Sequence, residues 1–440
     1  MISHEEKVQR ISNYLKNRKS NSHLIIIKKV VSHQVPKPNT SNKDIEGLDI
    51  SDLNQILDIN PKEKTCTAEP GVTFFDLVKA TMKYNLVPIV VPELKTITIG
   101  GAVAGCSIEA TSYKNGGFHD TCLEYEVVSA KGDIFQCTPN NENREMFQMI
   151  HGTFGTLGIL TKLKFKLMDA KPFVKMTYET YSTLEAYKKA ISAHYTNKDV
   201  DFMDGIIFSP EKFVLCIGNF VDSAPYFHKY EWMIPFYKSV EKRKEDYIPT
   251  YDYFFRYDSD CHWIAKNYGL ENPILRFLLG KFLLSSTKML TIAKKLAPIM
   301  KKVKPDVVVD VFIPFSNFDT FFEFYKKEFN YFPLWMVPYR VVRKYEWINR
   351  DFMKDVKDEL FIDLAIYGMK QEGNKNYYKI MEDEIFKLKG IKTLISYNFY
   401  DEVTFWKIWN KENYDRIKKV MDPDNILDDL YHKTHKNLIK

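Results

Sequence analysis

Several features that mark other protein classes are missing from this 440-residue chain. Its six cysteines are widely scattered and none forms a C-x-x-C pair, so a structural zinc site is not expected. Scattered free thiols in a chain of this size indicate a reducing compartment. No window approaches ~18 uninterrupted apolar residues, and the charged segment 1–10 lacks the apolar core of a signal peptide. We therefore expect a cytoplasmic protein without a signal peptide or a transmembrane anchor.

A strong excess of one charge sign is also missing. The 63 Lys and Arg residues nearly balance the 57 Asp and Glu residues, which leaves a formal net charge of +6. A charge this small for the length fits a weak attraction to anionic surfaces. It argues against a dedicated nucleic-acid partner, and no nucleic-acid recognition motif is present.

The motifs of several large enzyme classes are absent as well. There is no Walker A sequence, no G-x-S-x-G elbow and no zinc-type histidine cluster. Gly152, Gly155 and Gly158 have a dinucleotide-like spacing, but they follow a predicted helix and precede a predicted strand. A Rossmann fingerprint needs the opposite order. We therefore predict no separate nicotinamide-binding domain.

The apolar pattern predicts two or so domains, with a change of character near residue 170. Before this point short strands, a hairpin and short helices alternate; after it, long helices and apolar strands predict an α+β region with an antiparallel sheet. The expected helices are 5–18, 74–84, 146–150 and 184–195, with a further start near Ser51. The expected strands are 24–27, 65–69, 122–129, 134–137, 159–167, 202–208, 213–220, 307–312 and 360–366.

The most informative segment is 91–109, which sets three glycines and a run of small residues between two apolar stretches. Backbone can approach a bulky ligand closely here, because little side chain stands in the way. Consecutive free N–H groups in such a segment suit phosphate or a polar ring edge. A tight turn packed against a neighbouring element explains the same composition, so the segment alone does not decide the matter.

The neighbours of this segment favour a ligand site. Thr67–Leu77 lies upstream, and Gly116–Asp120, Tyr125–Val128 and Phe154–Leu160 lie downstream. In this order and spacing they resemble the FAD domain of the vanillyl-alcohol oxidase, or PCMH-type, superfamily. More narrowly, they resemble its branch that contains the delta(24)-sterol reductases. The resemblance covers most of the chain and continues through segments such as 272–277, 332–335, 362–368 and 402–406.

This resemblance implies an α+β fold with a PCMH-type two-subdomain FAD-binding domain and an α+β cap domain. The implied boundaries are 1–170 for the FAD domain, 171–404 for the cap and 405–440 for an element that returns to the FAD domain. It implies noncovalent FAD as cofactor and NADPH as electron donor. It also implies reduction of a carbon–carbon double bond in a sterol or related isoprenoid.

The residues expected to bind FAD come from the loop after the first strand, the small-residue segment and the later glycine-rich stretch. They are Ser32, His33, Pro92, Glu93, Thr98, Ile99, Gly100, Gly101, Ala102, Val103, Ala104, Gly105, Cys106, Ser107, Ile108, Glu109, Ala110, Asp120, Gly158 and Ile159.

Alkene reduction also needs an acid, because an unactivated alkene accepts a hydride poorly unless a proton reaches its other carbon. Asp363 and Tyr367 belong to a matching cap segment, and a buried carboxyl can be kept protonated by desolvation. Tyr397 in the cap and His119 on the FAD side are further candidates. Each of these residues also has an ordinary structural role as an alternative.

Two other functions stay open at this point. One is an FAD-dependent oxidase or dehydrogenase of an alcohol, lactone or sugar, and the other is a non-catalytic flavin- or lipid-binding protein. A basic, apolar stretch at 274–302 suits peripheral contact with a membrane, although a packed helix with a solvated lysine face has the same composition. The sequence leaves the oligomeric state undetermined.

Overall fold

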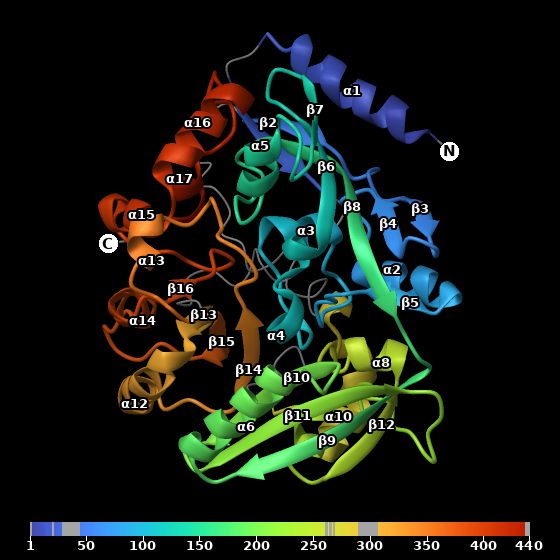
Figure 1. The fold of residues 1–440 in the computed structure, drawn as a ribbon, viewed down its shortest axis with the longest axis vertical. Coiled ribbons are helices and arrows are strands. Elements are labelled where there is room, and N and C mark those ends of the chain that lie inside the picture. The colour runs from blue at the N-terminus through green and yellow to red at the C-terminus, as the bar shows by residue number, and fades with distance from the viewer. Residues whose placement is uncertain are drawn as a thin grey trace.

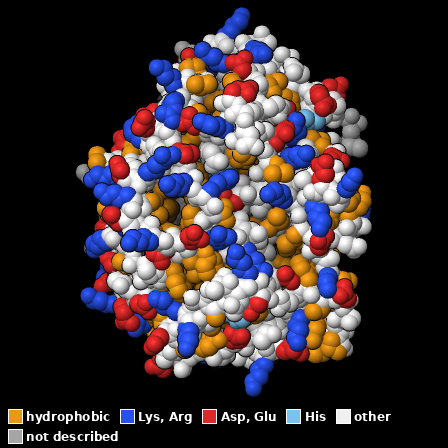
Figure 2. Space-filling view, viewed as in Figure 1, with side chains coloured by type: hydrophobic (Ala, Val, Ile, Leu, Met, Phe, Trp, Pro, Cys, Tyr) orange, Lys and Arg blue, Asp and Glu red, His pale blue; other side chains and the backbone are white. Residues whose placement is uncertain are grey.

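The computed structural model describes residues 2–19, 22–28, 45–259, 263, 266, 269–288 and 307–435. Two antiparallel sheets of different halves of the chain dominate it, joined by the long strand β8 and its continuation into β9 (Figure 1). On the face shown in Figure 2, Lys and Arg side chains are interspersed with Asp and Glu and with apolar side chains. This mixed face agrees with the small net charge.

The N-terminal half is built on a six-stranded sheet with the order β3-β4-β8-β6-β7, in which β5 also pairs with β8. A separate parallel pair, β1 and β2, lies beside it. Its elements are α1 (His4–Lys16), β1 (His23–Ile27), β2 (Ile45–Asp49), β3 (Ile56–Asn60), β4 (Thr65–Ala68), α2 (Phe74–Thr81), β5 (Leu86–Pro88), α3 (Ile99–Ala104), α4 (Ser112–Asn115), β6 (Cys122–Val128), β7 (Ile134–Cys137), α5 (Arg144–Met149) and β8 (Ile159–Asp169), with 3₁₀ turns at Met82–Tyr84 and Phe118–Thr121.

The second half is built on an eight-stranded antiparallel sheet with the order β12-β9-β11-β10-β14-β15-β13-β16. Its elements are β9 (Phe173–Tyr181), α6 (Leu184–Asn197), β10 (Phe202–Ser209), β11 (Lys212–Val221), α7 (Phe236–Val240), β12 (Glu245–Pro249), α8 (Thr250–Phe254), α10 (Pro273–Leu283), β13 (Val307–Pro314), α12 (Phe318–Glu328), β14 (Leu334–Arg340), α13 (Arg350–Met353), β15 (Leu360–Met369), α14 (Tyr377–Lys387) and β16 (Ile391–Lys392), with a 3₁₀ turn at Phe315–Asn317.

After β16 the described residues form three helices, α15 (Glu402–Ile408), α16 (Lys411–Met421) and α17 (Leu430–Thr434), and this segment returns to the first half. The N–H of Ala130 donates to the Met421 carbonyl at 2.7 Å, and the N–H of Leu24 donates to the Ile426 carbonyl at 2.7 Å. Ile426 and Leu427 also share a buried apolar cluster with Leu24. The C-terminal segment therefore completes one wall of the first half.

The two halves meet at a buried group of charges. The Arg256 guanidinium on the cap side lies 2.9 Å from an Asp204 carboxylate oxygen and 3.3 Å from a Glu109 carboxylate oxygen of the first half. Trp335 Nε1 and the Tyr257 hydroxyl each donate to Asp204 at 2.9 Å. Because buried charges persist only when they are paired, this group fixes how the halves pack.

The α+β fold class with an antiparallel cap sheet is confirmed, and so is the 122–137 hairpin, which is β6 and β7. The helix start near Ser51 is wrong. The Ser51 N–H instead donates to the Asp49 side chain in a turn that leads to β3. The change from one sheet to the other falls between β8 and β9, near residue 170. The three domain boundaries stay predictions.

Candidate active site

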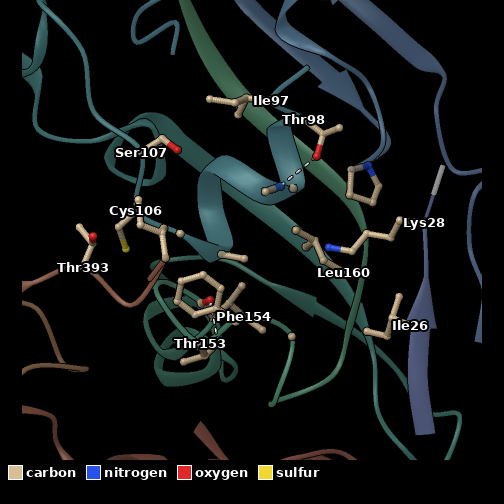
Figure 3. Close-up of a pocket in the computed structure, with 18 of the residues that line it drawn as sticks. Ile26, Lys28, Ile97, Thr98, Cys106, Ser107, Thr153, Phe154, Leu160 and Thr393 are labelled. Carbon is tan, nitrogen blue, oxygen red and sulfur yellow. Dashed lines mark hydrogen bonds between the residues drawn. The ribbon is translucent and has the colours of Figure 1, made fainter. Parts of the chain in front are cut away.

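A cavity of about 670 Å³ lies between the two halves. Its walls come from β1, the turn before α2, the 92–108 segment, the 150–160 loop, the inner strands of the cap sheet and the C-terminal segment. Figure 3 shows the part of the wall that contains Ile26, Thr98, Cys106 and Phe154. Large pockets with mostly apolar walls and a few polar groups are the usual sites of cofactors. This cavity is therefore the candidate site.

The small-residue segment forms a short helix, α3, in place of the expected loop. Thr98 caps it, since the Gly101 N–H donates to Thr98 Oγ1 at 3.2 Å (Figure 3). The N–H groups of Ile99 and Gly100 donate to the carbonyls of Val72 and Pro70, at 3.0 and 2.9 Å. These donors are thus used within the protein, so α3 offers a ligand mainly a flat face of small side chains.

The two glycines at the start of α3 have different roles. A Cβ at Gly100 would lie 2.5 Å from the Pro70 Cβ, so this glycine is needed for packing inside the protein. A Cβ at Gly101 would meet only the Thr98 hydroxyl oxygen, at 3.2 Å. Gly101 lines the cavity, so a side chain here would fill the space of a ligand and leave the core intact.

Most of the predicted FAD residues lie on this wall. The cavity is lined by Pro92, Glu93, Thr98, Gly100, Gly101, Ala104, Gly105, Cys106, Ser107, Ile108, Gly158 and Ile159. Ile99, Ala102 and Val103 turn the other way and are fully buried in the core. Glu109 turns toward Arg256, and the neighbouring Ala110 is also buried away from the cavity-lining set.

The facing wall is apolar. Ile26, Phe154 and Leu160 line it, and Figure 3 shows the Phe154 ring below α3. Phe154 has a φ of +52° and Cys106 a φ of +54°, a conformation uncommon outside glycine. Burial raises the pKa of the Cys106 thiol well above its ordinary value, so this cysteine is a neutral thiol.

At the cap end, acidic groups from two neighbouring strands face the cavity. Asp363 and Tyr367 are on β15 and Asp310 is on β13, where Asp310 pairs with Ala365. This register sets Asp310 diagonally beside both β15 residues. The Tyr367 hydroxyl accordingly donates to Asp310 at 2.5 Å. Glu93 of the first half lines the same cavity.

These carboxylates make Asp363 a strong candidate for a neutral acid. Burial, with the charges of Asp310 and Glu93, raises the pKa of Asp363 well above its ordinary value. Among the described residues, its Oδ1 atom has no hydrogen-bond partner. A protonated carboxyl with a free oxygen at a cavity wall can donate to a ligand.

The opposite end of the cavity is basic. Lys28, directly after β1, and Lys433 of α17 both line it. The pKa of Lys433 is lowered to about 8, mainly by burial; Asp428, which also lines the cavity, raises this pKa, and Lys28 and Lys418 lower it. Two lysine ammonium groups whose charge is only partly balanced by nearby carboxylates are suited to bind a diphosphate.

His119 and Asp120 are placed behind this cavity. His119 is buried with its ring 4.9 Å from that of His151 and 5.6 Å from that of Tyr345. Asp120 accepts from the Tyr345 hydroxyl at 2.8 Å and pairs with Arg343 at 3.0 Å. Neither residue is among the described residues that line the cavity. Their predicted contacts to substrate or FAD stay predictions, and the geometry gives them a supporting position.

Ser32 and His33 lie outside the described residues. Tyr397 packs against Tyr378 and is not in the described lining. Sequence reasoning missed Asp310 and Lys433. The signal for Asp310 was available, because an acid in the apolar strand 307–312 is unusual. Lys433 carried no local signal, since its position depends on how the C-terminal segment folds back.

The residues present fit FAD. A flat face at Gly101 and Gly105 opposite apolar side chains suits a planar ring system, and the basic end suits a diphosphate. The open space beside Gly101 would let such a group approach α3 closely.

Comparisons with known proteins agree with this fit. Residues 3–138 match the FAD binding domain family. Delta(24)-sterol reductase of Homo sapiens is 24% identical over 92% of this chain and 80% of its own. The Arabidopsis thaliana Delta(24)-sterol reductase is 25% identical over 98% of this chain and 85% of its own. Cytokinin dehydrogenase 5 of Arabidopsis thaliana is 26% identical over 36% of this chain and 29% of its own.

The sterol reductases thus match both halves, whereas the cytokinin dehydrogenase matches a shorter part. The match of the first half to the FAD binding domain family, the cavity between the halves and the similarity of both halves to delta(24)-sterol reductases agree with one another. Together they support an FAD-linked oxidoreductase.

Proposed function

We propose that this protein reduces a carbon–carbon double bond in a sterol or related isoprenoid, with NADPH as electron donor. The main observation in support is that a single cavity is lined both by α3 and by the buried acids of the cap. Similarity to sterol reductases across the cap half, and not only the FAD half, supports this reaction over a shared cofactor alone.

When bound, FAD supplies hydride chemistry. Gly101 of α3 and Gly105, which follows the helix, would leave room for its ring, and Lys28 and Lys433 would hold the charge of its phosphates. The apolar walls exclude water from the reacting carbon atoms. Noncovalent binding is sufficient for this arrangement.

Asp363 is the proposed proton donor. Burial and the neighbouring carboxylates raise its pKa well above the ordinary value, which favours the protonated carboxyl, and a proton on a cavity-facing oxygen can pass to the alkene carbon that does not receive the hydride. Tyr367 is bonded to Asp310, so it is better placed to hold that carboxylate beside Asp363 than to donate itself. We therefore propose Tyr367 as a positioning residue.

An anaerobic reaction tests the function. The flavin is photoreduced and mixed with desmosterol or another isoprenoid alkene, and the saturated product is sought by mass spectrometry. We expect reoxidation of the flavin with formation of that product. The protein would be an oxidase instead if sterols do not reoxidise the reduced flavin, oxygen reoxidises it rapidly and an alcohol reduces it again. Bleaching by NADPH compared with NADH identifies the donor.

The Asp363→Asn variant tests the proton donor. We expect FAD binding to persist and the reduction step to slow by about 10²–10⁴-fold, the usual contribution of a general acid. In the native protein the rate should fall as pH rises through the raised pKa of Asp363, and the variant should lose this fall. A native rate in the variant would show that the proton comes from elsewhere.

We also propose that the protein meets its lipid substrate by peripheral contact with a membrane. No helix among the described residues is long and apolar enough to cross a membrane.

A further inference from the structure

The cap carries an unusual concentration of uncovered apolar side chains on α10. Ile274, Phe277 and Phe282 are 70%, 62% and 70% exposed, and Leu275, Leu278 and Leu279 are exposed as well. Burial of only Arg276 and Gly280 anchors this helix to the protein. Six exposed large apolar residues on an 11-residue helix form far more than the scattered contacts of an ordinary surface.

A second segment extends this face. Tyr226, Phe227, Met233 and Ile234, in the loop between β11 and α7, are also exposed. The loop is fixed to α10, because Arg276 Nε donates to the Trp232 carbonyl at 2.5 Å. A Cβ at Gly280 would lie 2.9 Å from the Trp232 ring, so helix and loop are in direct contact. We name the two segments together, residues 226–234 and 273–283, the α10 face.

On α10 itself the charged side chains are both positive, Arg276 and Lys281, whereas the loop of the α10 face carries Glu231 beside Lys229. Lys281 is exposed on α10, and Lys288 follows the helix and donates to the Lys281 carbonyl. In the sequence, residues 272–305 contain one arginine and seven lysines, which makes eight positive charges, and no Asp or Glu. This exceeds the net charge of +6 of the whole chain, so the remainder of the chain is slightly acidic.

We propose that the α10 face is a lipid-docking surface that holds the protein against an anionic bilayer. Apolar side chains that enter the headgroup boundary, with lysines that meet anionic headgroups, are the chemistry of such surfaces. A second copy of the chain fits less well. A two-fold contact through α10 would bring like charges of both copies together without an acidic partner on this helix.

The docking surface is connected to the wall of the cavity. The Ser286 hydroxyl, just after α10, donates to Asp258 at 2.5 Å, and the same Asp258 oxygen accepts from the Lys95 N–H at 3.0 Å. Leu94 and Thr96, on both sides of Lys95, line the cavity. Under the proposed function, the segment that follows the docking surface is therefore bonded directly to the 92–97 wall of the substrate cavity.

Vesicle flotation with the full-length, FAD-loaded protein tests the surface. We expect binding to phosphatidylcholine vesicles that contain phosphatidylserine, weaker binding without it, and release by added salt. Phe277→Asp with Phe282→Asp, and separately Phe227→Asp with Ile234→Asp, should each lower the partition by about tenfold or more, because each pair removes apolar burial. Val403→Asp is the matched control, since Val403 is 68% exposed on α15, and it should bind normally.

Flavin content and circular dichroism verify that each variant is folded. Vesicle binding that survives both double substitutions overturns the proposal, and so does equal loss in the Val403→Asp control. The α10 face would instead be an interface between two copies if the native protein is a dimer that does not bind vesicles and the Phe277→Asp, Phe282→Asp variant is a monomer. Because flotation needs no turnover, its failure is separate from a failure of sterol reduction, which is measured with detergent-dispersed substrate.

Discussion

At the scale of single residues, Gly101 is the position at which we expect a side chain to block FAD from α3. A valine here meets only the Thr98 hydroxyl inside the protein, but its methyl groups enter the cavity. We expect Gly101→Val to purify folded and colourless, with FAD affinity lowered by about 100-fold or more, equivalent to about 3 kcal/mol of lost contact. Flavin absorbance per protein and circular dichroism measure the two properties.

Gly100→Val is the contrasting variant. Its Cβ would clash with Pro70, so this change should lower the melting temperature as well as the FAD content. Full retention of flavin by Gly101→Val would remove α3 from the FAD site.

We expect Lys433, which lines the cavity, to give FAD binding a pH dependence. Its pKa is lowered to about 8 without the cofactor, so it loses its charge as pH rises above this value. A diphosphate favours the charged form and should raise the pKa. We therefore expect FAD affinity to be highest below pH 8 and to fall as pH rises through 8 to 10, with proton uptake on binding.

Titration of apoprotein with FAD across this pH range measures the effect. The Lys433→Met variant should bind FAD more weakly at pH 7, and its FAD affinity should change little between pH 8 and pH 10. An unchanged profile in this variant would assign the pH dependence to another group. Lys83→Met, a change of the same type outside the described cavity lining, is the control.

At the scale of elements, α1 is fastened to the first sheet by buried ionic bonds. His4 bonds to Glu69 at 3.0 Å and to Glu126 at 2.8 Å, and Lys7 pairs with Glu69 at 2.9 Å. Burial alone lowers the pKa of His4, but its hydrogen bonds to the two carboxylates outweigh this and raise it to about 9. Protonated His4 therefore stabilises the folded protein.

The sign of this linkage follows from the raised pKa. The stabilisation is complete below the ordinary histidine pKa of 6.5 and is lost as pH rises through about 9. We expect His4→Ala to lower the free energy of unfolding by about 2–3 kcal/mol at pH 6, and the difference from the native protein to shrink toward pH 10. Denaturant unfolding measures this, with the exposed Gln9→Ala on α1 as control.

At the scale of the whole molecule, the Asp204–Arg256–Glu109 group joins the two halves. Arg256→Met leaves two buried carboxylates without their cation, and burial already raises the pKa of Glu109 to about 8. We expect a loss of about 3–5 kcal/mol in the free energy of unfolding, and a cavity that holds FAD less firmly because both halves line it. Denaturant unfolding and flavin release measure these changes.

Adding Asp204→Asn to Arg256→Met should recover part of the stability, because one uncompensated charge is removed. Strictly additive losses in the double variant would show that the two side chains do not act as a pair.

Much of the fold was predictable because its signals are local. Turn residues at 131–133 and alternating apolar residues predicted the β6–β7 hairpin, and the apolar run 360–366 predicted a cap strand. Small residues at 98–106 predicted close approach of a ligand, since the absence of side chains is a property of the sequence itself. Similarity to a known family then supplied the cofactor.

Only the tertiary structure decided which polar groups meet. Asp310 and Tyr367 are 57 residues apart and are joined by the register of β13 and β15. Lys433 reaches the cavity because the C-terminal segment packs against β1. The first N–H groups of α3 donate hydrogen bonds to the carbonyls of residues 70 and 72, and no local sequence pattern predicts these bonds. Strand pairing and burial depend on residues far apart in the sequence. The raised pKa of the acid and the grouping of the charged side chains therefore arise only when the chain folds.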